Sequence, residues 1–215
     1  ICMDRSVELY VGILAILKAG SAWCPIDETA PVQRRTSLIA RTQSKILLTN
    51  TQSLHLVEPC LCQKSLESLR IILIDEYANH KSTVNPDPRQ GTLSPYELSG
   101  QDLAYLLWTS GTTGEPKGVM IQHFAATQAM RDLQIQVEHD QNCEQVRVLQ
   151  HCSYSFDVFV QDLFYTWGLA GSVISGTREL VLGTFVEFIW AAHPTHVHLT
   201  PSFGASVPVD EIKGS

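Results

Sequence analysis

Short apolar runs alternate with longer stretches of helical periodicity along this chain of 215 residues. Each apolar run is short for a helix and predicts a buried strand, whereas apolar residues at every third or fourth position in the longer stretches predict helices. Strands separated by helices form a parallel sheet with helical crossovers, so the predicted fold class is α/β, a parallel sheet flanked by helices. The predicted strands are 45–49, 70–75, 103–108, 147–150, 172–175 and 196–199, and the predicted helices are 7–18, 31–41, 123–137, 157–169 and 185–192.

The first predicted helix has a capping signal at each end. Ser6 precedes it and can accept a hydrogen bond from a free backbone N–H, while Gly20 follows it as a terminator. Apolar residues such as Val7, Val11 and Ile13 cover most of its circumference. We therefore expect this helix to be largely buried.

Periodicity disappears between Glu76 and Asp102, where prolines and glycines lie among polar residues. Such composition predicts a surface loop over 76–102, and we interpret it as a loop within one domain rather than as a linker between two. The chain length suits a single core, because cores stop growing at roughly 250–300 residues.

The charge balance argues against nucleic acid as a partner. Fifteen Lys and Arg face 22 Asp and Glu, a net charge of −7, whereas phosphate contacts need clustered positive charge. Neither a membrane-spanning run nor a signal peptide can be recognised. We expect a cytoplasmic protein that binds no membrane.

Cysteine and histidine spacings give little reason to expect a metal. Cys60 and Cys62, the tightest pair of the six cysteines, lack the spacing of zinc knuckles, so we interpret the cysteines as reduced thiols. His193, His196 and His198 form H-x-x-H-x-H, with no acidic or cysteine ligand close in sequence. Ordinary strand and loop histidines are the favoured interpretation, and a metal site is the alternative.

A loop rich in glycine and hydroxyl residues follows the predicted strand 103–108. Its three glycines allow close backbone approach, its hydroxyls supply donors, and its lysine adds a point charge, a composition that suits a polyphosphate. A flexible linker is the less specific alternative. The candidate ATP- and phosphate-binding residues are Thr109, Ser110, Gly111, Thr112, Thr113, Gly114 and Lys117.

A Walker A loop is the more specific alternative, because Gly111 and Lys117 have the spacing of its first glycine and its lysine. Two positions disagree. Pro116 stands where that loop has a glycine, and Gly118 stands where it has the hydroxyl residue that holds magnesium. A P-loop NTPase is therefore disfavoured.

Three segments together resemble adenylate-forming enzymes, in the form of the adenylation (AMP-binding) domains of nonribosomal peptide synthetases. The strand followed by Thr-Ser-Gly-Thr-Thr-Gly-Glu-Pro-Lys-Gly at 109–118 resembles their signature loop. Leu-Lys-Ala-Gly-Ser-Ala-Trp-Cys-Pro-Ile-Asp at 17–27 is similar to their helix-end motif, and Ser-Phe-Asp-Val-Phe at 155–159 to their Phe-Asp-x-Ser element, with Phe159 in place of the serine.

The resemblance also implies a substrate pocket. In the family, the position of Asp157 pairs with the α-ammonium group of the amino acid, and a carboxylate in an apolar pocket needs such a cation. Val158, Gln161 and His198 fall at or near other pocket positions. From the sequence alone, Asp157 could equally be the N-cap of the helix that follows. The polar residues within 161–164 are expected on the solvated face of that helix.

The implied reaction joins an amino-acid carboxylate to the α-phosphate of ATP, giving an aminoacyl adenylate and pyrophosphate. The acyl group then passes to the pantetheine thiol of a carrier domain. Mg²⁺ is expected with ATP, although no ligand for it can be named, and carrier and condensation domains of the parent synthetase are the expected partners.

The resemblance is incomplete. The family's Tyr-Gly-Pro-Thr-Glu and Thr-Gly-Asp motifs and its C-terminal subdomain find no match, and 208–215 match nothing in it. Residues 1–215 are thus expected to be part of an N-terminal subdomain, truncated at both ends. The parent would be an AMP-forming ligase, whereas the isolated chain lacks motifs needed for turnover. The alternatives are an inactive remnant that at most binds nucleotide weakly, and a fragment of an acyl- or aryl-CoA ligase.

Overall fold

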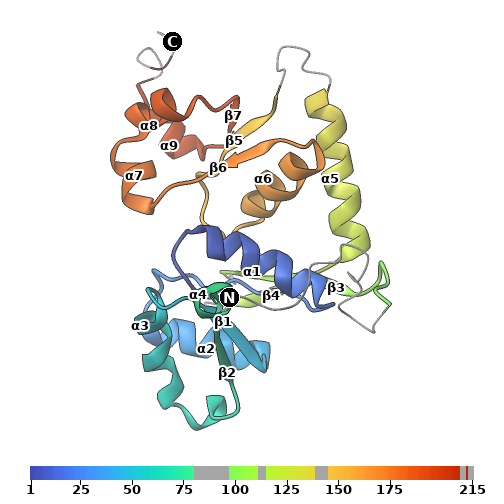
Figure 1. Cartoon of the computed structure of the whole chain (residues 1–215), viewed down its shortest axis with the longest axis vertical. Coiled ribbons are helices and arrows are strands. Elements are labelled where there is room, and N and C mark those ends of the chain that lie inside the picture. The colour runs from blue at the N-terminus through green and yellow to red at the C-terminus, as the bar shows by residue number, and fades with distance from the viewer. Residues whose placement is uncertain (80–96, 111–114, 139–144, 209–211, 213–215) are drawn as a thin grey trace. The chain divides into compact units, whose positions relative to one another are not determined.

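The computed structural model describes residues 1–79, 97–110, 115–138, 145–208 and 212. They fall into two compact units, Ile1–Ala125 and Ala126–Ser215, each with its own strands and helices (Figure 1). Within the described part of the chain, no helix combines the length and the apolar character needed to cross a membrane.

A parallel pair of strands organises part of the first unit. β1 (Ile46–Thr49) and β2 (Arg70–Leu73) are parallel, with Leu47 opposite Ile71, which confirms both predicted strands and their direction. The predicted helix before them is also confirmed as α2 (Val32–Thr42). The connection between the strands contains three short helical segments that the sequence did not indicate: α3 (Leu54–Val57), η1 (Glu58–Cys62) and η2 (Lys64–Leu66).

The core of the first unit forms where α2 and these short segments cover β1. Burial raises the pKa of the Cys2 thiol to about 12, so this thiol stays protonated and behaves as an apolar side chain. The buried residues that pack together are Cys2, Ile26, Leu38, Ile39, Leu47, Val57, Cys60 and Leu66.

Helix α1 (Val7–Lys18) has the predicted N-cap but not the predicted burial. The Ser6 hydroxyl accepts a hydrogen bond from the Leu9 backbone N–H at 3.3 Å. Leu9, Gly12 and Ile13 are buried, whereas Val7 and Val11 are 73% and 50% exposed. The expectation of a largely buried helix was wrong, because one face packs and the apolar residues on the opposite face remain accessible.

Helix α4 (Ile74–Asn79) directly follows β2 and occupies the beginning of the segment predicted as a loop over 76–102. The predicted strand 70–75 is correspondingly shorter, since its last residues belong to this helix. Residues 80–96 of the predicted loop lie outside the described residues.

An antiparallel hairpin completes the first unit. β3 (Leu103–Thr109) confirms a predicted strand, and β4 (Lys117–Gln122) was not predicted. Val119 and Met120 of β4 are 42% and 67% exposed, so the strand lacks the regular burial that gives a period of two its sequence signal. On its other side β3 bonds to Trp23, whose backbone N–H donates to the Ala104 carbonyl at 3.1 Å.

The second unit contains a three-stranded parallel sheet in the order β6-β5-β7. Its strands are β5 (Arg147–Leu149), β6 (Ser172–Ile174) and β7 (His196–Val197), each inside a predicted strand. Parallel direction is as expected for strands joined through helices. Helix α6 (Asp157–Gly168) connects β5 to β6 and packs against both.

Further helices surround this sheet (Figure 1). Two of them confirm predicted helices, α5 (His123–Glu138), which spans the boundary of the two units, and α8 (Phe185–Ala192). Two short ones were not predicted, α7 (Arg178–Gly183) and α9 (Pro201–Ser206). Met130 of α5, Val148 of β5 and Tyr165 of α6 form the small buried core on one side of the sheet.

A buried arginine joins separate segments of the first unit. The Arg35 side chain, on α2, is only 6% exposed. Its guanidinium donates to the Leu56 carbonyl at 2.9 and 3.1 Å, to the Glu28 carbonyl at 3.1 Å and also to the Ala30 carbonyl. One cation thus satisfies backbone groups of the segments before α2 and within α3.

We expect Arg35→Leu to lower the free energy of unfolding by about 2 kcal/mol or more, because a buried carbonyl that loses its donor costs about 1–3 kcal/mol. Urea unfolding followed by circular dichroism would measure it. Arg34→Leu, at the exposed neighbouring position of α2, is the control and should change stability by less than about 0.5 kcal/mol. Equal effects of the two substitutions would contradict this role of Arg35.

Candidate functional site

The candidate phosphate loop closes the β3–β4 hairpin. Thr109 at the end of β3 lies opposite Lys117 at the start of β4, and the Thr109 hydroxyl donates to the Lys117 carbonyl at 3.3 Å. Thr109, Ser110 and Lys117 are exposed, so a ligand can reach them. Gly111, Thr112, Thr113 and Gly114 lie outside the described residues. The hairpin therefore brings the two described ends of the loop together.

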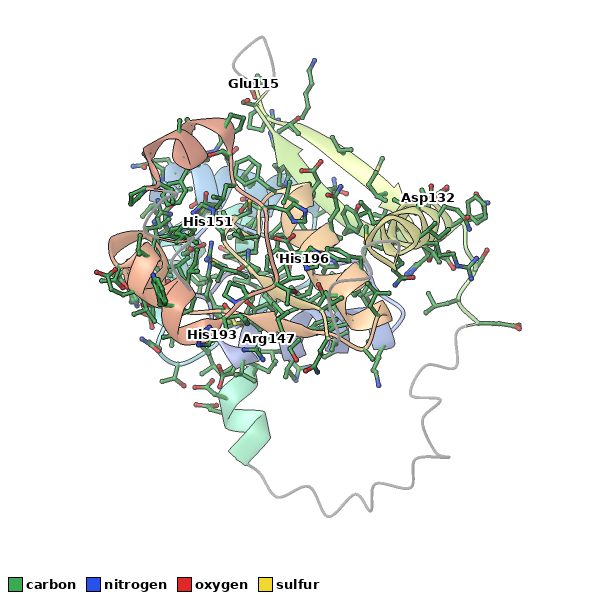
Figure 2. All side chains as sticks on the ribbon, turned by 90° about the horizontal axis from the view of Figure 1, so that it is seen from above. Glu115, Asp132, Arg147, His151, His193 and His196 are labelled. Carbon is green, nitrogen blue, oxygen red and sulfur yellow. The ribbon has the colours of Figure 1, made fainter. Side chains whose placement is uncertain are left out.

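Arg41 of α2 contacts Glu115 and Pro116, the two residues that precede β4. Its guanidinium contacts the Glu115 carboxylate at 2.6 Å and donates to the Pro116 carbonyl at 3.1 Å. The two side chains are 42% and 72% exposed, and an exposed ion pair adds only about 0–1 kcal/mol to stability. Figure 2 labels Glu115, which lies two residues before the start of β4 in the chain.

Asp157 lies at the first position of α6 and is exposed. Phe156 occupies the N-cap position, and the Asp157 carboxylate accepts from the adjacent Val158 backbone N–H at 2.9 Å. The alternative of Asp157 as the N-cap residue is therefore wrong. Its surroundings also differ from the expected apolar pocket, since the carboxylate faces solvent at the helix start. Val158 and Gln161 are half-buried on the same helix.

Asp162 is completely buried, which contradicts the expectation that the polar residues within 161–164 lie on the solvated face of the helix. Its carboxylate accepts a hydrogen bond from His198 Nδ1 at 2.5 Å, so α6 and the segment after β7 meet at this pair. The His198 side chain remains 50% exposed. Helical spacing indicates this pairing only weakly. Asp162 lies four residues after Val158, which is expected near the same pocket as His198, so the two residues share a face of α6.

The pair is electrostatically coupled. The hydrogen bond from His198 to the Asp162 carboxylate raises the pKa of His198 above the ordinary 6.5, against the opposing effect of partial burial. Burial raises the pKa of Asp162, while the His198 hydrogen bond opposes that rise. Burial and the nearby Asp162 charge raise the pKa of Tyr165, on the same helix, to about 12. The imidazole thus gives the buried carboxylate a hydrogen-bond partner that can carry the opposite charge.

The three histidines of the H-x-x-H-x-H segment have separate surroundings. His193 ends α8 in a left-handed conformation with φ 45°, and Arg147 donates to its carbonyl at 3.2 Å (Figure 2). His196 contacts the Thr195 hydroxyl through Nδ1 at 2.8 Å. Among the described residues, no three His, Cys, Asp or Glu side chains are placed to hold a metal ion.

The candidate residues thus form two groups. The described phosphate-loop residues belong to the first unit, and Asp157, Val158, Gln161 and His198 belong to the second. In the second unit, α6 carries Asp157, Val158 and Gln161 and meets His198 through Asp162. The first group offers hydroxyls and one cation to an anion, and the second offers an exposed carboxylate and an imidazole.

Comparisons with known sequences give one consistent result. The family model for AMP-binding enzymes matches residues 1–210. The siderophore peptide synthetase fer3 of Mycosarcoma maydis is 47% identical over 211 residues, which are 98% of this chain and 4% of that relative. The nonribosomal peptide synthetase sidC of Aspergillus fumigatus is 44% identical over 209 residues, 97% of this chain and 4% of that relative.

Solved structures confirm the predicted fold class. The N-terminal subdomain of Klebsiella oxytoca NpsA, in complex with 3-hydroxybenzoyl-AMSN, has a TM-score of 0.75 at 20% identity, over 98% of this chain and 49% of that one. The nonribosomal peptide synthetase FmoA3, bound to α-methyl-L-serine-AMP, has a TM-score of 0.76 at 22% identity, over 100% of this chain and 22% of that one. This chain therefore spans 4% of the length of each of the two synthetases compared by sequence, and 22% and 49% of the two solved chains.

We expect a histidine titration by NMR to give a pKa for His198 above 6.5. Because this pKa is raised in the folded state, the stabilisation that it reports is complete below 6.5 and is lost as the pH rises through the raised value. Asp162→Asn keeps the shape but removes the charge, and should lower the pKa of His198.

Asp157→Asn is the matched control for this titration, since it neutralises a carboxylate of the same helix that accepts its hydrogen bond from the Val158 backbone N–H. It should leave the His198 titration in place. A pKa of His198 that responds equally to both substitutions would contradict the direct pairing with Asp162.

Proposed function

Because the chain belongs to the family of AMP-binding enzymes, we propose that it is part of an adenylation domain that activates an amino acid for a nonribosomal peptide synthetase. The observation that carries the proposal is the hairpin loop Thr109–Gly118, which has exposed hydroxyls and Lys117 at its two described ends, within a chain that the family model matches almost throughout. The parent protein would be an ATP-dependent, AMP-forming ligase, and residues 1–215 would be part of its N-terminal subdomain.

In the proposed reaction, an oxygen of the amino-acid carboxylate attacks the α-phosphorus of ATP. The bond from that phosphorus to the bridging oxygen breaks, and pyrophosphate leaves. Thr109, Ser110, Gly111, Thr112, Thr113, Gly114 and Lys117 would hold the β- and γ-phosphates. The ammonium group of Lys117 would stabilise the charge that builds on the leaving pyrophosphate. Mg²⁺ would arrive with ATP.

The amino acid would bind in the second unit. Asp157 would pair with its α-ammonium group, which orients the carboxylate for attack, and its exposure at the start of α6 leaves it accessible for that contact. Val158, Gln161 and His198 would contact the side chain. The aminoacyl group would then pass to the pantetheine thiol of a carrier domain, next to condensation domains of the parent synthetase. The reaction would take place in the cytoplasm.

ATP–pyrophosphate exchange, with the chain extended on both sides by its genomic flanking sequence, is the direct test. Lys117→Ala should reduce kcat/KM for ATP by about a hundredfold, the order of magnitude for a lost electrostatic donor in a transition state. Lys64→Ala, at an exposed lysine of η2, is the control and should leave exchange unchanged. An unaltered rate and apparent ATP affinity in Lys117→Ala would remove this lysine from the phosphate site.

Asp157→Ala in the same extended protein should abolish exchange that depends on amino acids, because the α-ammonium group would lose its partner. The apparent KM for ATP should stay within about twofold, since the phosphates contact other residues. Intact amino-acid-dependent exchange in Asp157→Ala would instead favour the acyl- or aryl-CoA ligase alternative, whose substrates carry no α-ammonium group.

A further inference from the structure

Burial of the Asp162 carboxylate within the structure carries a desolvation free-energy cost. A carboxylate removed from water must be paired, and an apolar residue of similar volume is often more stabilising than a buried ion pair. Asp162 is 0% exposed, and its second oxygen, Oδ2, is buried without a hydrogen bond in the described part of the chain. The packing of α6 alone therefore does not explain why an acid occupies this position.

The contacts of Asp162 and Tyr165 hold the imidazole ring of His198 in place. His198 is joined to Asp162 through Nδ1, which leaves the other ring nitrogen, Nε2, on a side chain that is half exposed. The ring is also confined by Tyr165, which it meets edge to face with centroids 6.2 Å apart. The hydrogen bond to the buried Asp162 and the contact with Tyr165, both residues of α6, restrict how the imidazole can turn.

The protonation state of His198 determines whether its Nε2 donates or accepts a hydrogen bond. A neutral imidazole that donates through Nδ1 has an acceptor at Nε2, whereas a protonated one donates from both nitrogens. The Asp162 carboxylate is buried and accepts a hydrogen bond from His198 Nδ1 at 2.5 Å, so a cation at His198 stabilises it. The same hydrogen bond raises the pKa of His198, which favours the protonated form. Nε2 is then an N–H donor on a side chain that is half exposed.

We propose that Asp162 is a positioning residue that directs the Nε2–H of His198 toward the bound amino acid, and that the activated amino acid carries an oxygen acceptor on its side chain. The inference rests on the proposed function, in which His198 contacts that side chain. An apolar side chain would leave the donor desolvated and unpaired, and a cationic one would meet a like charge. A hydroxyl, amide or carboxylate oxygen would accept the hydrogen bond.

The test compares amino acids of similar size that differ in a side-chain oxygen. Exchange with the extended protein is measured for serine against alanine, threonine against valine, and glutamine against norleucine. For the best pair, we expect the oxygen-bearing member to have a kcat/KM at least about tenfold higher, as for loss of a hydrogen bond to a charged donor.

Variants then separate positioning from a purely structural role. Asp162→Asn should raise KM for the preferred amino acid by about tenfold while kcat and the KM for ATP stay within about twofold, which a general loss of folding would not do. His198→Leu should remove the discrimination altogether. Asp132→Asn, which neutralises an exposed carboxylate of α5, is the control and should change neither constant.

The outcomes distinguish the two proposals. Exchange that prefers an apolar or cationic amino acid, or discrimination unaltered in both Asp162→Asn and His198→Leu, overturns the inference and leaves the proposed function standing. Absence of amino-acid-dependent exchange in the unsubstituted extended protein overturns both. If Asp162→Asn fails to fold, His198→Leu gives the deciding measurement.

Discussion

The pairing of β3 with β4 is the constraint on which the phosphate-loop proposal depends. An antiparallel register that places Thr109 opposite Lys117 determines where the loop leaves the sheet and where it returns. The backbone of Trp23 bonds to the other edge of β3, so the hairpin is anchored within the first unit. The Thr109 hydroxyl and Lys117, which are eight positions apart along the chain, thereby share one end of a hairpin.

Regular elements with a strong hydrophobic period could be predicted from the sequence. The strands Ile46–Thr49 and Leu103–Thr109 and the helices Val32–Thr42 and Phe185–Ala192 lie within two residues of their predicted bounds. β4 was missed because its apolar residues are largely exposed, and the exposure of Val7 was missed because periodicity identifies an apolar face without showing what packs against it.

The candidate site divides in the same way. The signature loop and Asp157 could be named as candidates from the sequence, because runs of consecutive residues carry both motifs. Asp162 could not, since it gains its meaning from a residue that follows it by 36 positions and meets it only in the fold. A polar residue on a helix usually marks the solvated face. That general rule fails here because the burial of Asp162 is compensated by a histidine from the segment after β7.

Arg41 also affects the charge that the hairpin presents. A phosphate loop with an acidic residue two positions before its lysine would repel a polyanion as readily as attract it. The guanidinium of Arg41 contacts the Glu115 carboxylate at 2.6 Å and offsets its charge. The electrostatic potential where the loop enters β4 is therefore set mainly by Lys117. High ionic strength screens exposed ion pairs and would therefore weaken the neutralisation of Glu115 by Arg41.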